Sequence, residues 1–401
     1  MKEIFKAAQI SDHVYWVGAI DWNIRDFHGY STNRGTTYNA YLILADKITL
    51  IDTVKFPFRD EMLSRISSII DPKDITYIIS NHSEMDHSGC LPATIETVKP
   101  EKIFASVRGV KTLSEHFHMD REITAVKEGD SINLGNIDVT FIETPMLHWP
   151  DSMFTYLPAD KMLFSSDAFG MHLASSERFA KKIDDDILKY EGEKYFANIL
   201  LPYSNLVSKL LEKVVKSGVE INIIVPDHGP VWGTPEGVQK VLKYYAAWAE
   251  QKSSPKALVV YDTMWQSTEK MAMMISEVLI SEGVDVKVMS MKSVHRSDVA
   301  LEMLDCGALI VGSPTLNNNI LPSISDVMTY LKGLRPKNLI GAVFGSYGWS
   351  GEAVEQLEAI MTEMKIELVA ESVSATYRPD AETLTNCVEM GKRIAEKLKD
   401  M

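Results

Sequence analysis

Four potential metal ligands stand within one short segment, His82-Ser83-Glu84-Met85-Asp86-His87. The segment follows an apolar run, Tyr77–Ser80, and is closed by Gly89, so we expect a buried strand that opens into a loop at its carboxyl end. Ligands and catalytic groups collect in such loops of α/β proteins. Two imidazoles and two carboxylates held this close together are stabilised by a cation between them, which indicates a metal site.

Three other segments repeat the order of apolar strand, potential ligand and turn. His148 follows a run that ends at Glu143, Asp167 follows Phe164, and His228 follows the run 221–225. Loops at one edge of a sandwich can bring all these segments together. The predicted metal ligands are therefore His82, Glu84, Asp86, His148, Asp167 and His228, with His87 as a possible seventh.

A structural role is the alternative for each histidine taken singly, because a lone histidine is more often a hydrogen-bonded polar residue than a ligand. We expect His13, His116, His118 and His295 to be of that kind. For the predicted ligands, the shared context favours one common site over a set of unrelated structural roles.

The composition limits the class of protein and its partners. At 401 residues, the chain is expected to form two domains, with three as an upper limit. A net charge of −14 argues against nucleic acid and against anionic membrane surfaces as partners. No stretch of about 18 apolar residues predicts a transmembrane helix, and the segment 1–10 lacks the apolar core of a signal peptide.

The three cysteines, Cys90, Cys306 and Cys387, are scattered and form no CxxC pair. This pattern implies no disulfide framework and fits a reducing cytoplasm. It also excludes a built-in four-cysteine iron site or zinc ribbon.

We place a domain boundary at a polar, proline-bearing joint, 251–256, which gives domains over 1–250 and 256–401. Helical patterns at 58–70, 205–216 and 237–250 interrupt many short strands in the first domain, which predicts sheets layered with helices. The expected strands of that domain are 14–20, 38–44, 49–52, 75–80, 103–106, 139–143 and 221–225.

The second domain alternates more regularly between the two kinds of element. The expected strands are 256–261, 284–289, 308–312 and 340–345, and a helix over 267–281 follows the first of them. Apolar strands that alternate with helices are typical of a doubly wound parallel sheet.

The order HxExDH, followed by a later His, Asp and His at strand ends, resembles the metallo-β-lactamase fold. Zinc hydrolases of that fold usually carry HxHxDH, whereas this chain has Glu84 in place of the second histidine. Together with the segments 21–30, 35–41 and 148–153 and the flavodoxin-like second half, this substitution resembles the flavodiiron proteins. The resemblance covers essentially the whole chain and is nearest to the rubredoxin:oxygen oxidoreductase type.

The resemblance implies an α/β protein with an N-terminal metallo-β-lactamase-like αβ/βα sandwich and a C-terminal flavodoxin-like doubly wound parallel sheet. It implies two iron ions, one held by His82, Glu84 and His148 and the other by Asp86 and His228. Asp167 is the candidate bridge, since a carboxylate has two oxygens to share, while His87 either ligates or turns away. Three carboxylates among the ligands suit iron or manganese better than zinc, although affinity order alone does not exclude zinc.

Three loops of the second domain resemble the FMN loops of a flavodoxin. Hydroxyls and backbone N–H groups at a helix N-terminus suit a phosphate monoester, whereas the phosphate-loop GxxxxGKS and the dinucleotide GxGxxG are both absent. FMN is therefore favoured over FAD, with Trp265, Tyr347 and Trp349 able to flank its ring. The alternative is that such loops only cap helices. The predicted FMN-binding residues are Thr263, Met264, Trp265, Gln266, Ser267 and Thr268, then Ser313, Pro314, Thr315, Leu316, Asn317 and Asn318, and then Ser346, Tyr347, Gly348, Trp349, Ser350 and Gly351.

The resemblance implies that FMN relays electrons from an external donor to the diiron site, which reduces dioxygen to water. Reduction of nitric oxide to nitrous oxide at the same site is an alternative, as are zinc-dependent hydrolysis and simple electron transfer with an inactive metal site. His28, Trp149, His172 and Tyr195 would line the substrate pocket. Rubredoxin is the expected donor, with a reduced deazaflavin as alternative, and the expected assembly is a head-to-tail homodimer, possible also as a dimer of dimers.

Overall fold

The computed structural model describes residues 5–401, so the first four residues of the segment 1–10 lie outside it. The chain divides into two compact units. The N-terminal unit comprises the chain up to Tyr195 together with Tyr203–Ala246, and the C-terminal unit comprises Phe196–Pro202 and Ala247–Met401. The predicted boundary at 251–256 lies just after α7 (Pro235–Glu250), the last helix before the flavodoxin-like sheet, and it stays a prediction.

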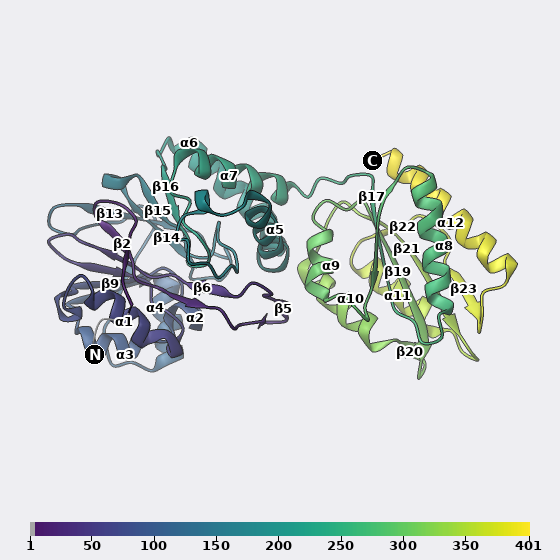
Figure 1. The fold of residues 1–401 in the computed structure, drawn as a ribbon, viewed down its shortest axis with the longest axis horizontal. Coiled ribbons are helices and arrows are strands. Elements are labelled where there is room, and N and C mark those ends of the chain that lie inside the picture. The colour runs from purple at the N-terminus through teal and green to yellow at the C-terminus, as the bar shows by residue number, and fades with distance from the viewer. Residues whose placement is uncertain (1–4) are drawn as a thin grey trace. The chain divides into compact units, whose positions relative to one another are not determined.

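Two sheets form the centre of the N-terminal unit (Figure 1). The first has the order β1-β2-β7-β8-β9-β10-β11 and the second the order β12-β13-β14-β15-β16. The strands of the first sheet are Ala8–Gln9, Val14–Trp16, Tyr41–Ile43, Thr49–Ile51, Tyr77–Ser80, Lys102–Ser106 and Thr124–Val126 in that order. Those of the second are Ser131–Asn133, Asp138–Glu143, Met153–Leu157, Met162–Phe164 and Ile223–Val225.

Successive side chains along a strand point to opposite faces of the sheet. The side chains of the first sheet therefore pack into two hydrophobic cores, one on each face. Tyr41 and Ile79 face the second sheet and pack with Phe141 and Phe164. Leu42 and neighbours on the other face pack against helices on the outside of the sheet. These helices are α1 (Arg59–Ser67), α3 (Leu91–Val98) and α4 (Val107–Phe117). The first sheet is thus buried on both faces, and the carboxyl ends of strands from both sheets meet at one edge of the sandwich.

Helices α5 (Asp185–Tyr195), α6 (Ser204–Ser217) and α7 (Pro235–Glu250) complete this unit on the side of β15 and β16 (Figure 1). The helices predicted at 205–216 and 237–250 are therefore present, each beginning one or two residues earlier. No helix within residues 5–401 has both the length and the apolar character needed to cross a membrane.

Two predicted strands are wrong as single elements, because the chain bends within each. The run 14–20 divides into β2 and β3 (Ala19–Asp21), and the run 38–44 divides into β6 (Thr36–Tyr38) and β7. At the first bend, a Cβ on Gly18 would lie 2.3 Å from the Tyr38 carbonyl oxygen. At the second, the backbone N–H of Asn39 donates to the Asp227 carbonyl over 2.8 Å instead of to a neighbouring strand. The bends carry the β3–β6 hairpin away from the main sheet.

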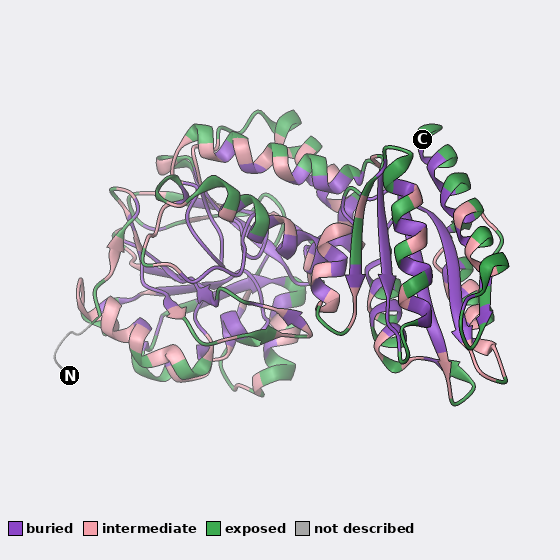
Figure 2. Ribbon diagram, turned by 45° about the vertical axis from the view of Figure 1, so that its right-hand side comes forward, coloured by how far each residue is buried: buried purple, intermediate pink, exposed green. Residues whose placement is uncertain are grey.

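The C-terminal unit is a parallel sheet of order β18-β17-β19-β21-β22, with β23 also paired to β21 and β20 paired antiparallel to β19. Helices cover both faces (Figure 1), and Figure 2 shows the strands buried between half-exposed helices. The strands β17 to β23 are Lys256–Tyr261, Asp285–Ser290, Ala308–Leu316, Asn319–Ile320, Ile340–Tyr347, Glu367–Leu368 and Val373–Thr376. The helices α8 to α12 are Ser267–Ser281, Arg296–Glu302, Pro322–Leu334, Glu352–Glu363 and Ala381–Lys399.

The sequence predicted β17 and α8 at their observed bounds but ended β19 and β21 too early. β19 continues through Leu316 because it forms a hairpin with β20, and β21 continues through Tyr347 because it pairs with β23. Part of the second and of the third predicted flavin loop is therefore strand. The core joins α8 and α12 to one face of the sheet, for example through Met271, Ile275 and Ile394. The doubly wound sheet predicted from the sequence is confirmed.

Candidate metal and flavin sites

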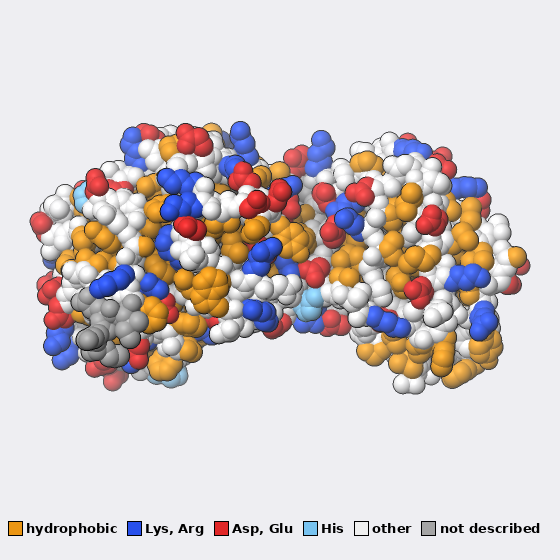
Figure 3. Space-filling model, viewed as in Figure 1, with side chains coloured by type: hydrophobic (Ala, Val, Ile, Leu, Met, Phe, Trp, Pro, Cys, Tyr) orange, Lys and Arg blue, Asp and Glu red, His pale blue; other side chains and the backbone are white. Residues whose placement is uncertain are grey.

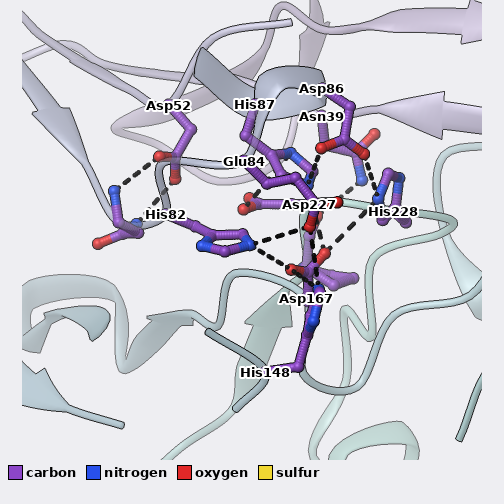
Figure 4. Close-up of polar contacts among 12 residues, drawn as sticks. Asn39, Asp52, His82, Glu84, Asp86, His87, His148, Asp167, Asp227 and His228 are labelled. Atoms are coloured by element: carbon purple, nitrogen blue, oxygen red, sulfur yellow. Dashed lines mark hydrogen bonds and ion pairs between the residues drawn. The ribbon is translucent and has the colours of Figure 1, made fainter. Parts of the chain in front are cut away.

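The segment 82–87 leaves the carboxyl end of β9 and enters a short helix, α2 (Met85–Ser88). The prediction of a loop was wrong for Asp86 and His87, which lie in that helix. The turn closes because the His87 N–H donates to the Glu84 carbonyl over 3.0 Å and the Ser88 hydroxyl donates to the Ser83 carbonyl over 2.7 Å. The tight turn aims the side chains of Glu84, Asp86 and His87 toward the second sheet (Figure 4).

One group of ligand atoms is formed by His82, Glu84, His148 and one oxygen of Asp167. Nε2 of His82 lies 3.3 Å from Glu84 Oε2 and 3.2 Å from Asp167 Oδ2. Nε2 of His148 lies 3.1 Å and 3.2 Å from the same two oxygens. The loop after β13 and the loop after β15 thus meet the HxExDH segment, as the strand-end pattern predicts.

A second group of ligand atoms is formed by Asp86, His87 and His228. Nε2 of His228 lies 3.1 Å from Asp86 Oδ2, and Nε2 of His87 lies 3.4 Å from Asp86 Oδ1. The Nε2 of His87 points into the group and away from solvent, since the side chain is fully buried.

Asp167 lies between the two groups and presents a different oxygen to each (Figure 4). Its Oδ2 faces His82 and His148, whereas its Oδ1 lies 3.3 Å from His87 Nε2 and 3.5 Å from His228 Nε2. The Tyr195 hydroxyl donates to the same Oδ1 over 3.0 Å. Asp167 is 1% exposed, so no bulk water competes for these oxygens.

The electrostatics of the cluster fit cations. Burial would lower the pKa of His82, but hydrogen bonding to Asp151 and Glu84 raises it well above its ordinary value. Burial likewise opposes charge on His148, yet Asp167 and Glu84 raise its pKa to about 9. Burial favours the neutral form of Asp167, but the charge of His87 and hydrogen bonding to His148 hold its pKa well below the ordinary value.

The carboxylates therefore stay charged and attract positive charge to the centre of the cluster. Both oxygens of Asp86 and Nε2 of His87 are buried without a hydrogen-bond partner. Buried polar atoms of this kind require partners, and two cations, one in each group of ligand atoms, would supply them. The donor set of imidazoles and carboxylates fits two iron ions.

Polar groups outside the cluster orient the candidate ligands through contacts on the side away from the proposed metal ions. His228 Nδ1 donates to the Thr37 carbonyl over 2.6 Å, which directs Nε2 into the cluster. His82 Nδ1 lies 3.4 Å from Asp151 Oδ2. The Asn39 side chain donates to the Pro226 and Gly229 carbonyls over 2.7 Å and 2.9 Å, which fixes the loop that carries His228. Such outer contacts set the tautomer and direction of a metal-binding histidine.

Sequence reasoning missed Asp52, Asp151 and Asp227. Asp52 accepts hydrogen bonds from the Asn81 N–H and side chain over 2.7 Å and 2.9 Å and so fixes the residue before His82. Asp227 Oδ2 lies 3.8 Å from His87 Nδ1. Asp151 lies within the segment 148–153 and Asp227 directly precedes His228, so their position near a candidate ligand was the sequence signal that they carried.

The four predicted pocket residues all lie around the cluster. His28 Nε2 is 3.0 Å from Glu84 Oε1, and the Trp149 ring centre is 5.2 Å from that of His82. His172 packs against His228 and Tyr195, with ring centres 4.7 Å and 5.1 Å apart. Their role in a substrate pocket stays a prediction.

Histidines that we expected to be structural make local contacts. His13 Nδ1 lies 2.6 Å from Asp160 Oδ1, and the His295 side chain accepts from the Ser297 N–H at the start of α9. His116 is exposed and stacks on Trp149, with ring centres 6.2 Å apart.

The predicted FMN loops gather at the carboxyl edge of the C-terminal sheet. Thr268 of the first loop and Ser346 of the third share a hydrogen bond of 2.9 Å. Asn318 of the second loop donates to Ser350 over 3.2 Å and to Glu352 over 2.7 Å. These hydrogen bonds join the first predicted loop to the third and the second to the third.

These loops fit a flavin phosphate and ring. The hydroxyl of Thr263 is buried without a partner in the loop between β17 and α8. An anionic phosphate is favoured at the N-terminus of the helix that this loop enters. Trp265 and Trp349 are 88% and 89% exposed, which is unusual for large aromatic side chains and suits a planar ligand between or beside them. Figure 3 shows hydrophobic side chains gathered on this unit where β20 lies.

Two family models match the chain, in the order expected from the resemblance. The model described as ODP family beta lactamase matches residues 36–229, and the Flavodoxin model matches residues 259–391. The two matches confirm the fold of each unit.

Comparison with whole proteins decides the family. The chain is 46% identical over 98% of its length to a protein named nitric oxide reductase from Moorella thermoacetica, 98% of which is covered. It is 44% identical to the structure of rubredoxin oxygen:oxidoreductase from Desulfovibrio gigas, with a TM-score of 0.97 over 98% of this chain and 99% of that one. A structure of the flavodiiron protein from Giardia intestinalis is 34% identical, with a TM-score of 0.92 and 98% of each chain covered. The chain belongs to the flavodiiron protein family.

Membership of the flavodiiron family confirms the cofactors expected from the sequence, FMN and two iron ions. Family membership also explains Glu84, which stands where zinc hydrolases of this fold carry a histidine. The substitution belongs to a redox family and not to the zinc hydrolases. The ligand and flavin residues assigned above stay predictions, supported by the geometry of this chain.

Proposed function

We propose that this chain is an oxidoreductase that reduces dioxygen to water at a non-haem diiron site with electrons relayed by FMN. The observation that carries the proposal is the position of Asp167, whose two oxygens face two separate groups of ligands. A carboxylate shared in this way is suited to a pair of metal ions. The names of the similar proteins, which refer to reduction of oxygen and of nitric oxide, support the same conclusion.

In this proposal, His82, Glu84 and His148 hold one iron, and Asp86 and His228 hold the other. Asp167 serves both ions. We assign His87 to the second ion, because its Nε2 faces Asp86 and Asp167 from a fully buried ring. When bound, the irons supply redox chemistry toward a small gas, and FMN supplies the electrons.

The protein's part is to keep the site dry and to place donors and acceptors around it. Burial lowers the pKa of His172 well below its ordinary value, so the ring stays neutral. Its Nδ1 lies 2.8 Å from the Thr36 hydroxyl, and its Nε2 is buried without a partner. Nε2 is therefore available to accept a hydrogen bond in the substrate pocket, while the Tyr195 O–H is directed at Asp167.

Nitric oxide is the second candidate substrate. The favouring observation is the 46% identity over nearly the full length to a protein named nitric oxide reductase. Zinc-dependent hydrolysis is not favoured, because the carboxylate-rich donor set and the flavodoxin unit both belong to the redox family.

The electron donor and the assembly are finer parts of the proposal. We propose rubredoxin as donor, on the name of the similar D. gigas protein, with a reduced deazaflavin as alternative. Because different units build the metal and flavin sites, we propose a head-to-tail homodimer in which each flavin serves the iron pair of the other chain. A dimer of such dimers is the larger assembly of the same kind. A cytoplasmic location is supported by three buried, unpaired cysteines.

The experiment is metal and flavin analysis combined with gas uptake. We expect about two irons and one FMN per chain and consumption of dioxygen or nitric oxide when the protein is reduced. Zinc in place of iron with no gas consumption would refute the proposal. Anaerobic titration with reduced rubredoxin and with reduced deazaflavin identifies the donor by the rate of flavin bleaching.

A further inference from the structure

Tyr377 has an unusual backbone and an unusual exposure for its residue type. It follows β23 directly, at the carboxyl edge of the C-terminal sheet. Its φ of 57° lies in the left-handed region, which bulky side chains rarely occupy without a constraint. Its side chain is nevertheless 66% exposed, so burial of the ring does not explain the constraint.

The constraint comes from hydrogen bonds to two of the predicted flavin loops. The Tyr377 N–H donates to the Tyr347 carbonyl over 2.6 Å. The Ser267 hydroxyl, at the start of α8, donates to the Tyr377 carbonyl over 2.6 Å. One strained residue therefore connects the first predicted flavin loop, 263–268, to the loop after β21. Strained residues that are held by their surroundings concentrate at binding sites.

The ring of Tyr377 faces the third loop. A Cβ on Gly348 would lie 3.2 Å from Tyr377 Cε1, so the absence of a side chain at 348 makes room for the ring. The neighbouring Trp349 is 89% exposed, and Trp265 of the first loop is 88% exposed. Three exposed aromatic side chains thus stand on three loops that follow β17, β21 and β23.

We propose that Tyr377 is a further residue of the flavin site, which sequence reasoning did not assign. Its ring forms one wall of the site. Its backbone fixes the first predicted flavin loop and the third loop relative to each other. The inference rests on the proposed binding of FMN to these loops. An exposed aromatic group at a binding edge gains contact area and stacking energy when a planar ligand covers it.

The test separates the ring from the backbone. Tyr377→Asn removes the ring but keeps a residue that tolerates left-handed φ, so both backbone hydrogen bonds remain. Tyr377→Phe keeps the ring. Lys365→Asn is the matched control, since Lys365 is exposed, has a φ of 62° and lies in the same unit at the end of α11. Each protein is stripped of FMN and titrated with it, and the midpoint potential of the bound flavin is measured.

We expect Tyr377→Asn to weaken FMN binding about tenfold, while the other two variants bind within about twofold of the parent protein. The midpoint potential should rise in Tyr377→Asn, because water reaching the flavin stabilises its charged reduced form. Tyr377→Gly repeats the test with a residue free to adopt this φ. Parent-like affinity and potential in both ring-less variants would overturn the inference. Failure of the parent protein to bind FMN would instead overturn the proposed function.

Discussion

Asp151 Oδ2 lies 3.4 Å from His82 Nδ1, and the same oxygen accepts hydrogen bonds from the Ser83 N–H and hydroxyl over 2.7 Å and 2.6 Å. A carboxylate behind a metal-binding histidine fixes the ring and makes it a stronger ligand. Asp151 thereby connects the loop that carries His148 to the segment that carries His82. The two segments that supply the first group of ligand atoms are thus held in a fixed relative position.

Replacement of this carboxylate should weaken metal binding without removing a ligand. In Asp151→Asn, an amide N–H₂ would face the His82 Nδ1–H, or the contact to Ser83 would be lost. We expect about 10- to 100-fold weaker iron binding, measured by competition with a chelator. Asp120→Asn, at an exposed carboxylate, is the control. Equal iron affinity in the two variants would show that Asp151 has no part in the site.

His87 is the candidate ligand that the sequence left open, and its buried Nε2, which faces Asp86 and Asp167, favours ligation. We expect His87→Ala to lose much of one iron, so that metal content falls from about two toward one per chain. The measurement is iron content together with the spectrum of the oxidised centre. Two irons with a parent-like spectrum would mean that His87 does not ligate.

The second flavin loop depends on a two-residue turn, Asn317-Asn318, in which φ is 51° and 60°. Left-handed φ at both central residues is typical of a hairpin that joins strands such as β19 and β20. We expect Asn318→Ala to lower the free energy of unfolding by roughly 1–2 kcal/mol more than Asn318→Gly, because glycine accepts this φ without strain and alanine does not. Denaturant unfolding followed by flavin fluorescence measures the difference. Equal free energies of unfolding in the two variants would contradict a left-handed turn at Asn318.

Metal removal should make stability depend on pH above neutrality. In the metal-free cluster, burial opposes charge on His148, but Asp167 and Glu84 raise its pKa from 6.5 to about 9. A raised histidine pKa stabilises the fold below the unfolded pKa, and this stabilisation is lost as pH rises through the folded value. The melting temperature of chelated protein should therefore fall between pH 6.5 and about 9. The melting temperature of iron-loaded protein should not fall in this way. If it fell with pH in parallel with that of the chelated protein, the proposed role of His148 in the metal-free cluster would be contradicted.

The grouping of the candidate ligands could be predicted because these residues share a local pattern. Glu84 and Asp86 are spaced within one segment, and His148, Asp167 and His228 each follow an apolar run. Strand ends converge at one edge of a sandwich, so a local pattern was sufficient to group them.

Residues whose role depends on which loops meet could not be predicted. In the sequence, Asp52 is only an acidic residue at the end of a strand. Its role becomes visible in the fold, where it accepts hydrogen bonds from Asn81. Asn39 is an ordinary polar residue until its N–H donates to Asp227, which bends the chain and divides a predicted strand. Tyr377 follows β23, a strand that pairs with β21 and that no pattern in the sequence predicted.

The central claim is tested most directly by one measurement on Asp167→Ala. The variant and the parent protein are reduced anaerobically and mixed with dioxygen or nitric oxide, while flavin absorbance is followed. Asp167 serves both groups of ligands, whereas the flavin loops lie in the other unit. We therefore predict normal flavin reduction in the variant and loss of rapid gas-dependent reoxidation. Reoxidation at the parent rate with either gas would contradict the account.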